Sequence, residues 1–252
     1  MNGQPKFTYD PASLQTLIKY ISLDRLAAYF AMAKTVPERA IRLHERNTEL
    51  SEAMYGVLQG FEITLRNSVH NSLSAAHGSE WYDKVRLLES ESSALHEAKH
   101  NIEQRIEKIT PGRVVAELNF GFWVRLFSAE YDRTLWGPSF RRILPMKLDR
   151  RTVYERLKEI KTLRNRIAHH NRIIGRKKPV EAHYRETLEA IGWFSPTMRI
   201  WVEQTNCLHE RLARKSPSAQ VPAPSLTEPE ITNPVANGVK IESALPKTSE
   251  TK

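Results

Sequence analysis

Apolar side chains recur every three or four residues along most of this chain, which is the spacing of helices with one buried face. Between residues 13 and 33 this stripe predicts two helices, with Ser22 as a break or cap between them. No alternation of polar and apolar residues beside a turn signal indicates a β-hairpin, and no internal repeat is present. The pattern therefore predicts an all-α fold.

A long helix follows the first two. Thr35 offers a capping side chain, and a proline and a glutamate come soon after it in the first turn. We expect this helix to continue to about Ala76 and to end at Gly78. Gly56 and Gly60 lie inside it and predict a kink or a close contact with another helix. Its buried stripe comprises Leu58, Phe61, Leu65, Val69 and Leu73.

The next segments alternate between polar and strongly apolar character. Residues 90–109 predict a polar helix whose inner positions are Leu95, Ile102, Ile106 and Ile109. Thr110 begins another helix, which leads into the aromatic-rich segment 118–127. An apolar run of that length also fits a buried strand, but its helical neighbours favour a helix, and we expect its aromatic rings in the core.

The segment after Leu144-Pro145 contains the most informative helix. Asp149 is its predicted N-cap, and further helices are expected over 179–191 and 196–212. The inner stripe of the helix after Asp149 comprises Val153, Leu157, Ile160, Arg164 and Ile167. An arginine at an inner position is costly unless it is paired or lines a cleft, and Glu62 is a candidate partner.

Composition divides the chain in two. Residues 216–252 contain six of the 14 prolines and no aromatic residue, so we expect a disordered tail behind a helical domain over 1–215. No apolar run approaches the length of a membrane span, and the first residues lack the apolar core of a signal peptide. The single cysteine, Cys207, excludes an internal disulfide, and a cytoplasmic location is expected.

The positive charge is concentrated in one segment. The chain has a net charge of +9, but residues 133–178 alone contribute +12. Such a segment predicts a surface that binds a polyanion, although a merely solubilising surface has the same composition, and charge does not separate RNA from DNA or anionic lipid. The candidate RNA-binding residues are Arg141, Arg142, Arg150, Arg151, Arg172, Arg176, Lys177 and Lys178.

Histidines follow the inner arginine at short range. Arg164 and Asn165 precede His169-His170, which places a titratable base near fixed positive charge. This combination suits metal-independent cleavage of RNA, in which a base removes the 2′-hydroxyl proton and arginine stabilises charge on the phosphate. In a straight helix Arg164 and His169 point about 140° apart. Either the helix loosens near residues 168–171, or a symmetric dimer holds one phosphate between two copies.

These strings resemble a known family. Arg164-Asn-Arg-Ile-Ala-His169 is similar to the R-x4-6-H signature of the HEPN superfamily, and the longer string over 163–172 resembles Abi-like (abortive infection) proteins. Residues 62–67 and 119–124 agree with the same resemblance. It implies a HEPN-type helical bundle with extra helices, a homodimeric metal-independent endoribonuclease, and a role in phage defence or growth arrest.

The resemblance assigns roles by position. Arg164 and His169 match the family's catalytic pair, and Asn165 its polar neighbour. The candidate supporting residues are Glu62, Arg66, Asn67, Arg166, His170 and Asn171. Glu62, Arg66 and His70 lie along one line of the long helix, either as an exposed salt-bridge ladder or with Glu62 orienting Arg66 or Arg164.

No cofactor or metal is expected. His96 and His100 have a metal-ligand spacing but no obvious carboxylate to complete a site, so we interpret them as surface residues. The expected partner is RNA, either tRNA or mRNA, and the family resemblance slightly favours tRNA. An antitoxin or a phage-derived trigger is also compatible with the family. The alternative is a helical module that binds nucleic acid or a defence partner without chemistry. A DNA-binding regulator is less favoured, because no helix-turn-helix signature is present.

Overall fold

The computed structural model describes residues 7–214, and within that range the secondary structure is helical, without a strand. The predicted tail over 216–252 lies outside the described residues. The helices are α1 (Pro11–Ile21), α2 (Leu23–Met32), α3 (Pro37–His77), α4 (Glu89–Gln104), α5 (Pro111–Glu117), α6 (Phe120–Arg125), α7 (Arg150–Ala168), α8 (Val180–Phe194), α9 (Pro196–Thr205) and α10 (Leu208–Ala213). The prediction of an all-α fold is therefore confirmed for the described chain.

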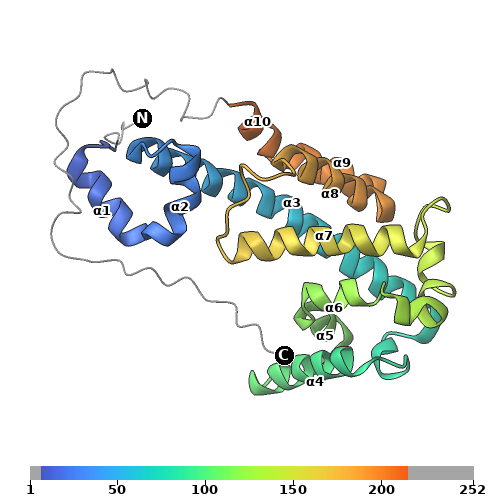
Figure 1. Ribbon diagram of the computed structural model, residues 1–252. Helices are drawn as coiled ribbons and strands as arrows, with labels where there is room; N and C mark the ends of the chain where they lie inside the picture. Colours follow the sequence, from blue (N-terminus) through green and yellow to red (C-terminus); the bar gives the residue numbers. More distant parts are fainter. Residues whose placement is uncertain (1–6, 215–252) are drawn as a thin grey trace, which may run out of the picture. The chain divides into compact units, whose positions relative to one another are not determined.

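Helix α3 is the central helix of this arrangement, and Figure 1 shows α7, α8 and α9 lying beside it. It contacts α2, α6, α7, α8, α9 and α10. At Gly60 it approaches α9 so closely that a Cβ atom would lie 2.5 Å from Cγ2 of Val202. The glycine therefore serves a close helix contact, which is one of the two roles predicted for it.

The main core lies between α3, α6, α7 and α8, and it contains the aromatic segment. Phe122 and Trp123 are buried, and their rings meet edge to face with centroids 5.1 Å apart. Asn119 caps α6 by accepting a hydrogen bond from the backbone N–H of Phe122 at 3.0 Å, and it separates α6 from α5. The segment is thus helical and buried as predicted, although it is interrupted before Phe120.

A second, smaller core joins α1 and α2 to the beginning of α3. Leu26, Tyr29 and Ile41 are buried in it. Ser22 has a positive φ of 80° and ends α1, and its hydroxyl accepts a hydrogen bond from the N–H of Arg25 at 3.3 Å to begin α2. The predicted break at this serine is confirmed.

Several local predictions were wrong. The helix expected over 196–212 is divided at residues 206–207 into α9 and α10. Helix α4 ends at Gln104, and Ile106, expected to be buried, is 97% exposed with a φ of 57°. Because the chain turns there before α5, the side chains of Ile106 and Ile109 are not presented to the core. Thr35 does not cap α3: the N-cap is Val36, without a capping side chain, because the residue directly before a proline at the first helical position takes that place.

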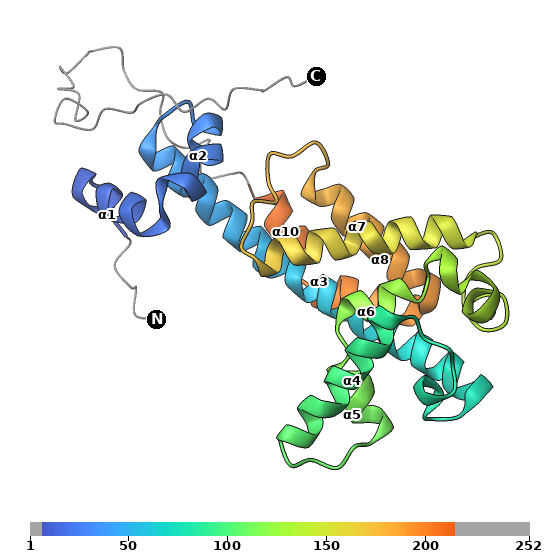
Figure 2. The ribbon, with the colours of Figure 1, turned by 60° about the horizontal axis from the view of Figure 1, so that its bottom comes forward.

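The remaining helical segments of the described chain are short turns. They lie at Trp81–Asp83, Ala129–Tyr131, Asp132–Trp136 and Phe140–Arg142. Helices α4 and α5 pack against each other, as Figure 2 shows from a second direction. Among the described helices, none combines the length and the apolar character that a membrane span requires.

Candidate active site

Helix α7 carries the predicted catalytic string. Asp149 begins it by accepting a hydrogen bond from the N–H of Thr152 at 2.8 Å, as the sequence predicted. The side chains of Val153, Leu157 and Ile160 are buried against the core. Arg164 continues this stripe but keeps about a third of its side chain exposed. The stripe therefore positions one guanidinium at the edge of the core.

Glu62 of α3 is the carboxylate nearest to that guanidinium. Its Oε2 lies 3.9 Å from Nε of Arg164, and the two side chains are 29% and 35% exposed. A half-exposed pair at this distance contributes little stability, about 0–1 kcal/mol. The contact leaves most of the guanidinium unengaged, and a guanidinium has five N–H donors, so several of them are left for a phosphate. The predicted partnership between Glu62 and Arg164 is confirmed.

Helix α7 ends at Ala168, just before the last residue of the string, in a Schellman turn. The N–H of His170 donates to the carbonyl of Ile167 at 2.9 Å, and the N–H of Asn171 donates to the carbonyl of Arg166 at 2.8 Å. His170 has a φ of 55°, at the position where glycine is usual. A non-glycine residue in this conformation costs about 1–2 kcal/mol. The turn therefore holds a histidine where backbone strain alone would favour glycine.

Two residues far away in the chain hold this turn in place. Nη1 of Arg25 in α2 donates to the carbonyl of His170 at 2.9 Å. The buried side chain of Asn47 in α3 accepts hydrogen bonds from the N–H groups of Ile173 and Ile174, at 2.7 and 3.3 Å. Sequence reasoning missed Arg25 and Asn47, and no local signal could have found them, because they lie 145 and 126 residues from their partners.

A groove of about 730 Å³ opens beside the end of α7. Its lining includes His44, Asn47 and Tyr55 of α3, together with Ala168 and His170. Burial, and next to it the charge of Arg25, lowers the pKa of His44, so its imidazole is neutral at pH 7. Of the two adjacent histidines, His170 lines the groove, whereas His169 is exposed and is not part of that lining.

The groove and the ion pair lie along one junction of α3 and α7. Seven residues make two helical turns, so Glu62 lies on the same side of α3 as Tyr55, about 10 Å farther along. Arg164 likewise lies one turn before Ala168 on α7. An extended chain that entered the groove at His170 would therefore pass toward Arg164.

His169 and Arg164 do not converge within one chain. Residues 164–168 are helical, and the N–H of His169 still donates to the carbonyl of Asn165 at 3.0 Å. The helix does end at Ala168, but this comes too late to bring His169 round to Arg164, and the offset of about 140° remains.

The other candidate supporting residues take different places. Nε of Arg66 donates to Oδ1 of Asn67 at 3.3 Å, and no ion pair joins Arg66 to Glu62 among the described residues. His70 accepts a hydrogen bond from the indole N–H of Trp81 at 3.0 Å, and burial lowers its pKa. The predicted ladder of Glu62, Arg66 and His70 is therefore not formed.

The eight candidate RNA-binding residues fall into two groups. Arg150 pairs with Asp132 at 3.1 Å, Arg172 donates to the carbonyls of Ile174 and Gly175, and Lys178 binds Glu159 and Glu186. The others are exposed and form no ion pair with described residues; they are Arg141, Arg142, Arg151, Arg176 and Lys177. The first group is engaged in the fold, and the second is free for a ligand.

Within residues 7–214, no cluster of three or more histidine, cysteine or acidic side chains is placed to hold a metal ion. The fold and the site thus define an all-α protein with a histidine-lined groove beside a half-exposed arginine. The family model of Abi-like proteins matches residues 17–175, more than half of the chain, so the chain belongs to the Abi-like protein family. Comparisons with curated proteins and with solved structures found no significant match.

Proposed function

We propose that this protein is a metal-independent endoribonuclease that acts in abortive-infection defence. The observation that carries the proposal is the junction of α3 and α7, where a partly exposed Arg164, paired with Glu62, lies one turn of α7 before a groove lined by His44 and His170. Membership of the Abi-like family supports the defence role. The string from Arg164 to His169 resembles the HEPN signature, and this resemblance supports the chemistry.

The reaction requires two proton transfers and one anion site. A histidine accepts the proton of the ribose 2′-hydroxyl while O2′ bonds to phosphorus and the bond from phosphorus to O5′ breaks. A second acid donates a proton to O5′, and the products are a 2′,3′-cyclic phosphate and a 5′-hydroxyl. Arg164 donates hydrogen bonds to the non-bridging oxygens, with Asn165 beside it. We assign the removal of the 2′-hydroxyl proton to His169. His170 is placed to contact RNA in the groove.

A homodimer would resolve the offset between Arg164 and His169. In a two-fold dimer the same residues face each other twice, so Arg164 of one protomer and His169 of its partner could share one phosphate. Light scattering at tens of micromolar should find a dimer, and a monomer with activity linear in protein concentration would contradict it.

Mixing two inactive variants tests the shared site directly. If each site combines two chains, a mixture of Arg164→Ala and His169→Ala should regain about a quarter of the parent activity, because half of the randomly formed dimers carry one intact site. No recovery in a mixture that is shown to exchange subunits would place both residues in one chain.

The central experiment is RNA cleavage in EDTA. The parent protein should cut and leave a 2′,3′-cyclic phosphate, and a 2′-deoxy nucleotide at the cut site should block the reaction. His169→Ala should lower the rate roughly 10²-fold or more, whereas His96→Ala, an exposed histidine on α4, should not. Cleavage abolished by chelator, or undiminished in His169→Ala, would refute the mechanism. RNA binding without cleavage would instead favour a non-catalytic binding module.

A further inference from the structure

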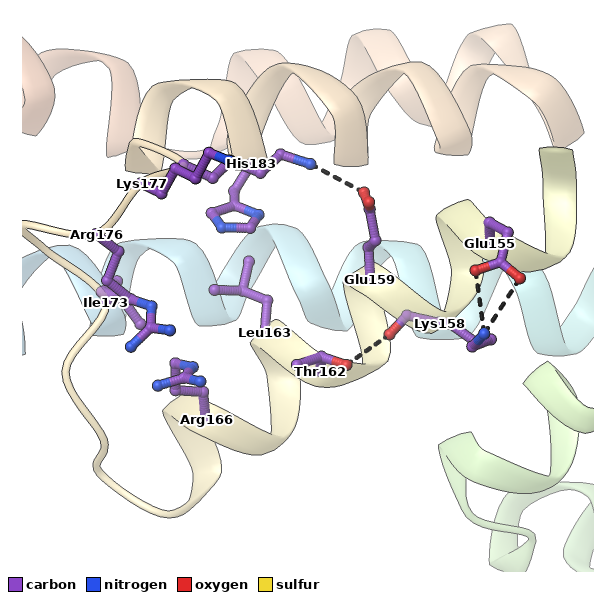
Figure 3. Close-up of a pocket in the computed structure, with 11 residues that line it drawn as sticks. Glu155, Lys158, Glu159, Thr162, Leu163, Arg166, Ile173, Arg176, Lys177 and His183 are labelled. Atoms are coloured by element: carbon purple, nitrogen blue, oxygen red, sulfur yellow. Dashed lines mark hydrogen bonds and ion pairs between the residues drawn. The ribbon is translucent and has the colours of Figure 1, made fainter.

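A second opening lies on the other side of α7. It has a volume of about 390 Å³, and α7, the loop before α8, and α8 itself surround it (Figure 3). Arg166, Arg176, Lys177 and His183 line it together with the apolar side chains of Leu163 and Ile173. Arg164 and Arg166 are two residues apart, so their side chains leave α7 about 160° from each other. The opening is therefore separate from the groove at His170.

The acidic side chains of this opening are already paired. Glu155 binds Lys158 at 3.0 Å, and Glu159 binds Lys178 at 2.9 Å. Lys178 also binds Glu186 of α8. Among the described residues, no carboxylate lies within ion-pair distance of Arg166, Arg176 or Lys177. Three positive charges thus remain uncompensated at one cavity.

The backbone that carries these cations is held in place by the fold. Figure 3 shows the guanidinium groups of Arg166 and Arg176 pointing toward each other at one edge of the opening. The loop that carries Arg176 is fixed by Asn47, which accepts from the N–H of Ile173 at 2.7 Å, and by Arg172, which donates to the carbonyl of Gly175 at 3.1 Å. Burial first, and then the charges of Arg176 and Arg172, lowers the pKa of Arg166. Like charges held at one cavity repel each other, and a bound anion would offset that repulsion.

His183 adds a neutral hydrogen-bonding group to the wall. Burial, followed by the charge of Lys178, lowers its pKa, so the imidazole is uncharged at pH 7. Leu163 and Ile173 are buried beside it and form an apolar surface. A cationic rim with a neutral ring and an apolar wall suits a ligand that is charged at one end and flat and less polar at the other.

We infer that this opening binds the phosphate group of a nucleotide, through Arg166, Arg176 and Lys177. Two guanidinium forks and an ammonium match the charge and the several acceptor oxygens of a phosphate better than the single plane of a carboxylate. A volume of about 390 Å³ leaves room for more than the phosphate itself. The inference concerns binding and stands independently of whether the protein cleaves RNA.

The test is a binding titration of the full chain at 100 mM salt with inorganic phosphate, adenosine 5′-monophosphate, adenosine, and a short single-stranded RNA without a terminal phosphate. The nucleotide or the RNA should bind, and adenosine should not. The double variant Arg166→Gln/Arg176→Gln should weaken that binding at least about tenfold, because charge-assisted contacts are lost. The matched control is Arg185→Gln, an exposed arginine of α8 outside the opening. Tighter binding of the monophosphate would identify a free nucleotide as the ligand. Tighter binding of the RNA would identify a backbone phosphate of RNA as the ligand.

Labelling of the intact protein gives a second measurement that needs no variant. Acetylation of Lys177 should slow in the presence of the bound nucleotide or RNA, whereas acetylation of the exposed Lys19 on α1 should not change. The proposal is overturned if none of the phosphate-bearing probes binds at millimolar concentration. It is also overturned if the double variant and Arg185→Gln weaken binding equally, or if Lys177 is labelled at the same rate with and without ligand.

Discussion

Arg164 and Arg166 lie two residues apart on one helix, and their surroundings differ in one respect. Arg164 faces α3 and has a carboxylate, Glu62, 3.9 Å away. Arg166 faces the loop before α8, and the charges that lower its pKa are those of other cations, Arg176 and Arg172. The charge of a paired arginine is partly compensated by its carboxylate. An unpaired arginine beside like charges is repelled by them, and a bound anion would reduce that repulsion. The two faces of α7 therefore suit different tasks, a reaction on one side and binding on the other.

The largest expected difference between the faces is in catalysis. Arg164→Ala should lower RNA cleavage roughly 10²-fold, because it removes donors aimed at the charge that develops on phosphate. Arg166→Ala, with the same change of charge, should lower it only a few-fold. Arg164→Lys should not restore full activity, since an ammonium lacks the guanidinium fork. Single-turnover cleavage rates at saturating enzyme measure these losses. Equal losses of rate in both alanine variants would contradict the different roles of the two faces.

The converse difference is expected in binding and is smaller. Arg166→Gln alone should weaken the affinity for adenosine 5′-monophosphate several-fold, because one of the two guanidinium forks is lost. Arg164→Gln should leave that affinity unchanged. Isothermal titration of both variants at one salt concentration compares them, and a weaker affinity in Arg164→Gln would show that the two faces share a ligand.

The orienting carboxylate should have a more modest effect than the arginine it holds. Glu62→Gln keeps the shape of the side chain but removes its charge, so Arg164 should lose orientation and cleavage should fall a few-fold. The rate at saturating RNA should change more than the affinity for RNA. A variant as fast as the parent would mean that the contact at 3.9 Å does not position Arg164.

The histidine on the binding face predicts a small pH dependence of stability. The pKa of His183 is lowered in the folded protein, so the unfolded chain takes up its proton first as the pH falls below about 6.5. This part of the stability is present above that pH and is lost as the pH falls toward the lowered pKa. Melting temperatures at pH 7.5 and 5.5 should differ less, by a few degrees, in His183→Gln than in the parent. An unchanged difference would exclude His183 as a contributor.

The smallest effect is expected for the segment with the tail-like composition. A chain that ends at Lys215 retains both faces of α7, and its melting temperature should stay within a few degrees of that of the full chain. The composition of residues 216–252 motivates this prediction. A large loss of stability would show that the segment is docked on the folded part.

Much of the helical framework could be predicted because the relevant signals are local. Ser22, Gly78 and Asp149 end or begin helices where the sequence indicated, through hydrogen bonds that reach only a few residues. The prediction was wrong where two local tendencies compete. Ile106 continues an apolar spacing, but the chain turns at that residue, and its side chain is 97% exposed.

The candidate site was predictable only in part. Arg164, Asn165 and His169 are named by a short string, and the position of Arg164 on the inner stripe indicated that it needed a partner. Glu62 was named as a candidate partner, but only the structure shows the pair, because a stripe does not specify which carboxylate of another helix lies opposite. The choice between His169 and His170 as the residue that lines the groove depends on a backbone turn with a φ of 55°, which no periodicity predicts.

The sequence by itself determined most of the helices and their order, the inner face of α7 and the presence of a histidine just after an arginine at its end. These properties follow from spacing and capping within about one or two turns of a helix. Only the tertiary structure decided that Arg25 and Asn47 hold the turn at His170, and that Arg166, Arg176 and His183 surround one opening. Such contacts join residues that are distant along the chain, and they arise from how the helices pack, which depends on all the packed side chains together.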